Sequence, residues 1–271
     1  MSRHRAIERK TDFRTWLAIA ALVFVPRVAR AAPTALDELL ARANDRVSKF
    51  VEAFSDVKCT EHVEQVKFRP DGKVELKEDS TYDYLVILTN AGGEVSLDES
   101  RLAVHEARKD EKKRVSMLVS NGFATLFLVF HPYYSLAFRF SDLGEDTING
   151  QKFHKIHFEH ISGMRSPVAL ALRGREYPLE LAGVAWIDPE TGVIARITAT
   201  LNEGMLDIGL KSLDAEVDFA PVMFSDSKAP SWFPSQAMVE VESPRQHWRN
   251  THRFTNYQKF SVSTDEKVAQ K

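Results

Sequence analysis

The first long pattern in the chain is that of an amphipathic helix. Apolar residues recur at spacings of three and four: Leu36, Leu39, Leu40, Ala43, Val47, Phe50, Val51 and Phe54. Polar and charged residues take the other side, as in a helix with one buried face. Thr34 is placed to cap the helix, with Asp37 in the capping-box position three residues later. The pattern predicts a helix of about twenty residues that packs on another element.

Most of the remaining chain alternates apolar and polar residues with a period of two. In the clearest run, Val193, Ala195, Ile197, Ala199 and Leu201 alternate with arginine and threonine, and residues 209–219 repeat the pattern. Such alternation predicts a sheet with one buried face and one solvated face. Turn signals separate the runs at Pro70-Asp71-Gly72, 90–93, Asn149-Gly150 and 188–192. We expect strands over 57–68, 73–89, 94–107, 135–141, near 146, and over 151–161, 183–187, 193–201, 209–219, 235–242 and 246–260.

Val115–Phe140 is the most apolar segment outside the N-terminus. Asn121-Gly122 is expected to start a helix that runs to about His131, with Pro132 ending it. One face of that helix would present Phe123, Leu126, Phe127 and Phe130. The glycine, histidine and proline divide the segment into pieces too short to span a membrane. The segment is therefore expected to turn its aromatic side chains inward, either as filled core or as the lining of a cavity.

A second short helix is expected over Val168–Arg173. Ser166 would be its N-cap, Pro167 its first helical residue, and Gly174 would follow its end. At under two turns this helix cannot be stable alone. It would either dock on the sheet as part of the core or form a mobile flap.

Together these elements predict a mainly β (α+β) fold. A twisted sheet of about ten or eleven strands tends to curl. We expect a curled antiparallel half-barrel with the long N-terminal helix and the short internal helices on its concave face. No repeat or linker divides the chain, so residues 32–262 would form one domain, followed by a polar tail over 263–271.

The N-terminus resembles a secretory signal peptide. Basic residues up to Arg14 precede the apolar run Trp16–Val25, and Ala29-Arg30-Ala31 offers small residues for cleavage. An apolar run of about half the ~20 residues that a helical crossing needs is too short to span a bilayer. Residues 1–31 are therefore expected to be removed near Ala31, leaving a periplasmic or secreted protein. An uncleaved signal anchor is the alternative.

Charge and cysteine content narrow the classes of partner. Without residues 1–31 the chain keeps 29 basic and 36 acidic residues, a net charge of about −7. This balance argues against nucleic acid, which requires a basic face. The single cysteine, Cys59, excludes an intrachain disulfide and is expected to be a small buried apolar side chain.

The sequence contains none of the common catalytic motifs: no G-x-S-x-G, Walker loop, G-x-G-x-x-G or C-x-x-C. The best candidate for a metal cluster is His154, His157 and His160. On a strand, the first and third would face one way and the second the other. We therefore assign no catalytic residue, no metal and no cofactor, and expect a protein that is not an enzyme.

The order of elements, together with the segment GVAWIDPETGVIARI at 183–197, resembles the periplasmic lipoprotein-carrier superfamily. This group includes outer-membrane lipoprotein-sorting proteins and related envelope-stress sensors. The resemblance covers most of residues 35–260, and its local motif is W-x-D followed by arginine, here Trp186, Asp188 and Arg196. It implies a half-open β-barrel with an apolar concave face closed by helices.

The resulting hypothesis is a periplasmic binding or carrier protein for an acyl chain, a lipid or a lipidated protein. Peripheral membrane contact and the oligomeric state are left open. The candidates for the ligand cavity are Phe123, Leu126, Phe127, Phe130, Tyr134, Phe138, Leu170 and Trp186. The alternative is an envelope structural, interaction or sensor module with a filled core, and a third reading is a hydrolase with a dispersed site.

Overall fold

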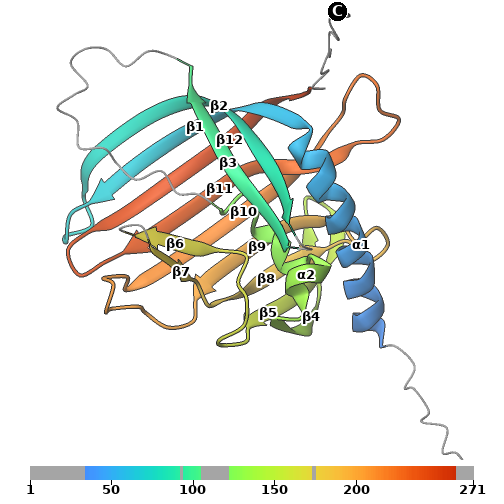
Figure 1. The fold of residues 1–271 in the computed structure, drawn as a ribbon, viewed down its shortest axis with the longest axis horizontal. Helices are drawn as coiled ribbons and strands as arrows, with labels where there is room; N and C mark the ends of the chain where they lie inside the picture. The colour runs from blue at the N-terminus through green and yellow to red at the C-terminus, as the bar shows by residue number, and fades with distance from the viewer. Residues whose placement is uncertain (1–33, 92–93, 105–121, 173–174, 261–271) are drawn as a thin grey trace, which may run out of the picture. The chain divides into compact units, whose positions relative to one another are not determined.

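The fold is a curled antiparallel sheet with a long helix against one side (Figure 1). The computed structural model describes residues 34–91, 94–104, 122–172 and 175–260, all within the compact unit Pro33–Lys271. The expected signal peptide and polar tail lie outside the described residues. The helical elements are α1 (Ala35–Ser55), the 3-10 helix η2 (Leu126–Phe130) and α2 (Pro132–Ser135). The strands are β1 (Val57–Phe68), β2 (Val74–Ala91), β3 (Glu94–Ala103), β4 (Phe138–Ile148), β5 (Gln151–His160), β6 (Ala169–Leu172), β7 (Arg175–Pro178), β8 (Leu181–Ile187), β9 (Ile194–Leu201), β10 (Ser212–Val222), β11 (Ser231–Glu242) and β12 (His247–Lys259).

Ten of these strands form one sheet in the order β3-β2-β1-β12-β11-β10-β9-β8-β5-β4. Every neighbouring pair is antiparallel, and the two edge strands, β3 and β4, do not pair with each other. The sheet is therefore curled but not closed. This confirms the predicted mainly β fold with a long N-terminal helix.

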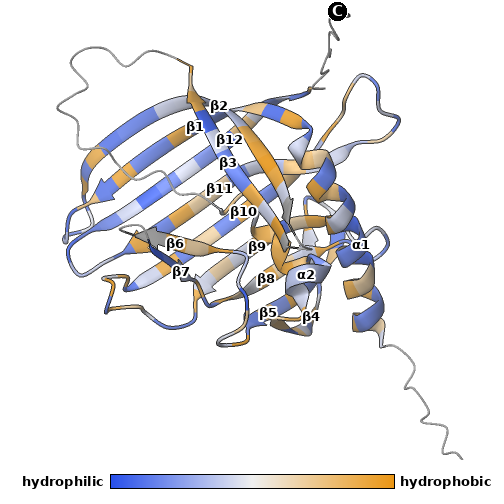
Figure 2. Cartoon of the chain, viewed as in Figure 1, coloured by the Kyte–Doolittle hydropathy of each residue, from blue (hydrophilic) through white to orange (hydrophobic). Residues whose placement is uncertain are grey.

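Alternation along the strands separates the two faces of the sheet, as predicted. In β10 the inward residues Leu213, Ala215 and Val217 are buried, while the residues between them are partly or fully exposed. Figure 2 shows the same pattern as alternating hydrophobic and hydrophilic bands across the sheet. The predicted hairpin at Asn149-Gly150 is confirmed, since both residues have positive φ, 51° and 83°, between β4 and β5.

Helix α1 begins and packs as its sequence predicts. Thr34 and Asp37 form the capping box, with the Asp37 amide donating to Thr34 Oγ1 at 3.2 Å and the Thr34 amide donating to Asp37 Oδ2 at 2.9 Å. The helix rests on the turn between β8 and β9. A Cβ at Gly192 would lie 2.6 Å from the backbone carbon and oxygen of Arg42. Glycine therefore permits the close approach of α1 to the sheet.

The helix predicted from residue 121 to His131 is shorter than expected, and its first residue lies outside the described ones. Five residues form the 3-10 helix η2, and Pro132 begins α2 instead of ending a helix. Proline suits a first helical position because no amide donor is needed there, and His131 Nδ1 caps the turn by accepting from the Tyr133 amide at 3.2 Å. The following strand starts at Phe138, later than the expected residue 135.

The predicted helix over Val168–Arg173 is wrong, because this segment contains strand β6. It pairs with β7, with Leu170 opposite Tyr177, in a separate two-stranded sheet. Ser166 does resemble an N-cap, since its hydroxyl accepts from the Val168 amide at 3.2 Å. The same hydroxyl donates to the Leu179 carbonyl at 2.8 Å, so it closes the hairpin rather than a helix.

Candidate functional site

The concave face of the sheet is closed at one end by η2 and α1. All five residues of η2 are buried, with 0–2% of their surface exposed. The Phe127 ring lies 4.8 Å from that of Phe50 on α1 and 6.2 Å from that of Phe219 on β10. This end of the half-barrel is therefore filled largely by the protein's own aromatic side chains.

The structure brings together all of the predicted cavity residues except Trp186. Buried in one apolar cluster are Phe123, Leu126, Phe127, Phe130, Tyr134 and Phe138, with Leu170 half-buried against it. Trp186 alternates with the buried residues Ala185 and Ile187 and so lies on the opposite face of the sheet. Its indole N–H donates to Asp146 Oδ2 at 2.9 Å, and the Arg196 guanidinium lies 5.8 Å from the ring. The Trp186–Arg196 motif is thus a cross-strand pair on the outer face.

Three hydrogen bonds hold the segment 122–135 in the interior. The Gly122 amide donates to Glu99 Oε1 at 3.0 Å, and the Tyr134 hydroxyl donates to the Val95 carbonyl at 2.8 Å, both on edge strand β3. With the Asn44 side-chain amide turned so that its nitrogen faces acceptors, that nitrogen donates to the Phe130 carbonyl at 2.7 Å. The segment is therefore tied both to β3 and to α1.

The interior reaches solvent at a small pocket beside α1. Its cavity volume is about 30 Å³, within about 310 Å³ of unoccupied space that includes open solvent. The walls are formed by Val47, Phe50, Phe127, Val193, Ile194 and Phe219, with Gly192 beneath α1 and with Arg46 and Trp232 also lining it. The pocket is thus an apolar opening with one cationic side chain.

A buried charged cluster crosses the concave face and was not recognised in the sequence. Arg101 on β3 donates to Glu61 on β1 at 2.5 and 2.8 Å and to Glu99 at 2.9 Å. His252 Nδ1 on β12 lies 2.8 Å from Glu61 Oε1. The sequence signal was parity, because Glu61 lies on the same face of β1 as the buried residues Cys59 and Val63.

Burial and pairing act differently on the acids of this cluster. Burial alone would raise the pKa of Glu61, but hydrogen bonds from His252 and Arg101 outweigh it and hold that pKa below its usual range. The pKa of Glu99 is raised because burial outweighs the charge of Arg101. Nearby Cys59 is buried as predicted, and burial raises the pKa of its thiol to about 12. This thiol is therefore unreactive at neutral pH.

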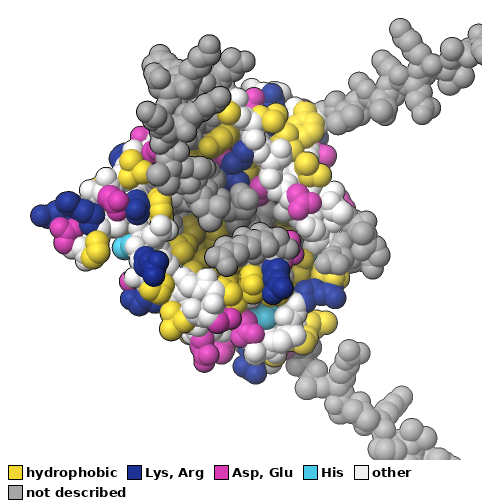
Figure 3. Space-filling view, turned by 60° about the vertical axis from the view of Figure 1, so that its left-hand side comes forward, with side chains coloured by type: hydrophobic (Ala, Val, Ile, Leu, Met, Phe, Trp, Pro, Cys, Tyr) yellow, Lys and Arg dark blue, Asp and Glu magenta, His cyan; other side chains and the backbone are white. Residues whose placement is uncertain are grey.

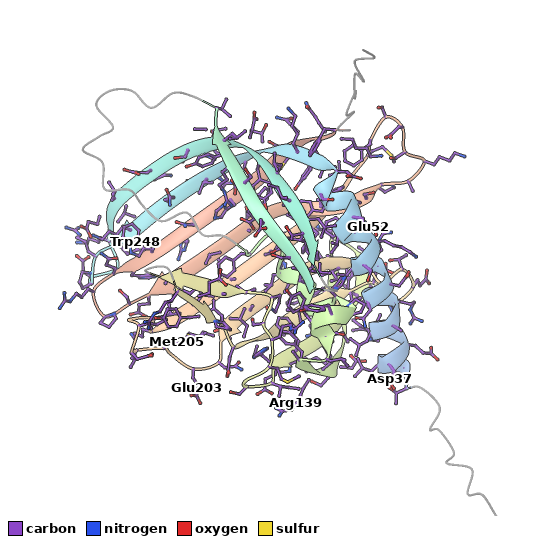
Figure 4. The ribbon with its side chains drawn as sticks, viewed as in Figure 1. Asp37, Glu52, Arg139, Glu203, Met205 and Trp248 are labelled. Atoms are coloured by element: carbon purple, nitrogen blue, oxygen red, sulfur yellow. The ribbon has the colours of Figure 1, made fainter. Side chains whose placement is uncertain are left out.

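The other end of the concave face carries a mixture of polar and aromatic side chains. Lys67 Nζ lies 5.4 Å from the centre of the Trp248 ring, and Gln65 Nε2 donates to Asn250 Oδ1 at 3.5 Å. Figure 4 places Trp248 and Asp37, at the start of α1, at opposite ends of the unit.

Figure 3 shows hydrophobic side chains in a hollow of the molecular surface.

The three histidines singled out in the sequence do not converge. His154 lies 3.3 Å from Asp142 in a partly exposed pair, whereas His160 is buried and contacts the Arg165 carbonyl at 3.2 Å. Across the described residues, no group of three histidine, cysteine, aspartate or glutamate side chains is arranged to hold a metal ion. Nor does any helix within the described ranges combine the length and the apolar character needed to cross a bilayer.

Comparison with known proteins gives likenesses of fold only. No family model matches the chain, and no curated protein sequence matches it. Among solved structures, a DUF1329 family protein from Desulfovibrio piger is similar with a TM-score of 0.41 and 11% identity, covering 83% of this chain and 95% of that one. An outer membrane lipoprotein-sorting protein domain from Vibrio parahaemolyticus is similar with a TM-score of 0.39 and 11% identity, covering 86% and 96%.

Proposed function

We propose that this chain is a periplasmic binding or carrier protein that holds the acyl chain of a hydrophobic ligand against the concave face of its half-barrel. The observation that supports this most directly is the apolar pocket beside α1, where the aromatic interior opens to solvent. The N-terminal pattern of residues 1–31 supports export to the periplasm.

The size of the pocket defines what binding would require. Its cavity volume of about 30 Å³ is far below the range of about 300–1,000 Å³ for ligand sites, so an acyl chain cannot enter unless the pocket widens. An acyl chain would have to displace side chains that line the pocket, among them Phe127. Burial of a chain contributes about 0.8 kcal/mol per CH₂, which offsets part of the cost of that rearrangement.

The direct test uses the mature protein purified from its native host. Mass spectrometry of the purified sample should reveal a co-purifying lipid, and a fluorescent acyl probe should bind and be displaced by unlabelled fatty acid. A sample that carries no lipid and does not bind the probe would refute the carrier function.

A matched pair of substitutions locates the site. Phe127 and Phe153 are equally buried, each 1% exposed, but only Phe127 borders the pocket and belongs to the main apolar cluster. Phe127→Leu and Phe153→Leu should each destabilise the fold by about 1 kcal/mol. Probe affinity should change in Phe127→Leu alone, as measured by fluorescence titration. Equal effects on affinity would place the probe elsewhere.

A second candidate function is an interaction or sensor module with a filled interior. The complete burial of η2 favours it, because the five side chains already occupy the space that a guest would need. This candidate predicts that the protein binds no acyl probe and that fatty acids leave its stability unchanged.

A further inference from the structure

Arg46 differs from the other basic residues on α1 in having no acidic partner within the described ranges. Arg42 lies 4.0 Å from Glu38, and Lys49 lies 2.6 Å from Asp45. For Arg46, which lines the pocket, no carboxylate oxygen of the described residues lies within the 4.0 Å limit of an ion pair. Among the described residues its charge is thus uncompensated by a carboxylate, beside an apolar pocket.

Trp232 adds a second donor at the same pocket. In the part of the chain that the structure describes, the indole N–H groups of Trp186 and Trp248 donate to Asp146 at 2.9 Å and to Gln246 at 3.0 Å. The indole N–H of Trp232 has no acceptor among the same residues. A guanidinium and an indole N–H therefore border walls that are otherwise made of aliphatic and phenyl groups.

We propose that this pocket recognises an amphiphile with one alkyl chain and an anionic end, such as a fatty acid, and that Arg46 determines this specificity. The inference rests on the proposed function. The alkyl chain would contact Val47, Phe50 and Phe127, while the anion accepts hydrogen bonds from Arg46 and Trp232. Guanidinium pairs with carboxylate or phosphate through charge-assisted bonds, which an alcohol or an amine cannot provide. An acyl chain joined to a protein by an amide also lacks the anionic end.

The test compares head groups on one chain length. Dodecanoate, dodecyl phosphate, dodecanol and dodecylamine are titrated against the wild-type protein by displacement of the fluorescent acyl probe. Both anions should bind about tenfold more tightly than dodecanol, and dodecylamine should bind most weakly. The ratio of the two anions distinguishes a carboxylate from a phosphate as the preferred end group.

Two substitutions one helical turn apart test whether Arg46 causes the preference for anionic ligands. Arg46→Gln should weaken dodecanoate binding about tenfold and leave dodecanol binding unchanged. Arg42→Gln removes the same charge from α1 but not from the pocket, so both affinities should stay at the wild-type value. Trp232→Phe keeps the ring and removes the N–H, and should weaken dodecanoate binding by about threefold.

The outcomes separate this inference from the function on which it rests. Equal binding of dodecanoate and dodecanol to the wild-type protein, or equal behaviour of Arg46→Gln and Arg42→Gln, would overturn the specificity while leaving the carrier function intact. Absence of binding by all four compounds and by the probe would overturn both.

Discussion

At the scale of single residues, the most consequential group is the buried carboxylate of Glu61. It is fully buried, and Arg101 and His252 donate to it from two other strands. A buried ion pair contributes little by itself, because desolvation offsets its attraction, but removal of one partner leaves a charge without compensation. The cost of breaking the cluster should therefore far exceed that of breaking a surface pair.

Glu61→Gln and Glu64→Gln provide the comparison. Glu64 lies on the same strand and pairs with Lys77 at 2.6 Å in solvent. Glu61→Gln should lower the free energy of unfolding by about 3 kcal/mol, and Glu64→Gln by less than about 1 kcal/mol, in urea titrations at neutral pH. Similar losses in the two variants would contradict the importance of the cluster.

The same variant has a defined pH dependence. Since the pKa of Glu61 is lowered in the folded protein, its stabilisation is complete above the unfolded pKa and is lost as the pH falls through the folded value. The difference between the wild type and Glu61→Gln should therefore shrink in acid, below about pH 4. A difference that stays constant from neutral pH into acid would show that Glu61 does not titrate in this way.

At the scale of elements, the docking of α1 depends on the turn at Gly192. Gly192 has a φ of 69°, and a Cβ added there would lie 2.6 Å from the backbone of Arg42, whereas Gly150 has a φ of 83° and a Cβ added there would meet nothing within 4 Å. Alanine at either position is strained by positive φ, at a cost of about 1 kcal/mol. Only at Gly192 must α1 also move away from the sheet.

We expect Gly192→Ala to be more destabilising than Gly150→Ala by about 1–2 kcal/mol, because steric overlap adds to the strain of positive φ. Gly192→Ala should also change acyl-probe affinity, since Gly192 lies in the pocket lining. Urea unfolding and probe titration of the two variants measure both effects. Equal destabilisation would mean that α1 yields to the added methyl group without cost.

Local signals predicted some elements and missed others for a physical reason. The cap at Thr34 and the turn at Asn149-Gly150 depend on residues within four positions, so the sequence shows them directly. Strand β6 depends on its pairing with β7, which local sequence does not show. The residues of η2 are all apolar and all buried, so this segment has no polar face that would reveal its helical period. In these two segments tertiary contacts outweighed local propensity.

The burial of the candidate cavity residues was predicted in part for the same reason. The apolar character of Phe127 and Phe130 marked them as interior residues, but alternation alone does not say which side of the strand containing Trp186 faces the core. The contact between Glu61 and His252 joins residues 191 positions apart. Such a pair becomes visible only when the order of strands in the sheet is known.

At the scale of the whole molecule, a packed core lies inside a sheet that is open between its edge strands, β3 and β4. If the core accepts a guest, the guest binds the folded state alone and stabilises it. Dodecanoate at one hundred times its dissociation constant should add about 2.7 kcal/mol to the free energy of unfolding.

Thermal unfolding with and without dodecanoate measures this effect, with Phe127→Leu as the variant of reduced affinity. The unfolding midpoint of the wild type should rise with ligand concentration, and that of Phe127→Leu should rise less. A wild-type midpoint that does not respond to dodecanoate would favour the filled interaction module.

The position of β12 between β1 and β11 has a consequence for how the chain folds. Strands β1 to β3 form one consecutive meander, and β8 to β11 form another. Strand β12 pairs with both, and its pairing with β1 places Lys259 opposite Val57, 202 positions earlier in the sequence. Contacts of such long range slow folding because a large loop must close first. During synthesis the two meanders therefore share no sheet until β12 has emerged, so the ten-stranded sheet forms only after nearly all of the described chain has been made.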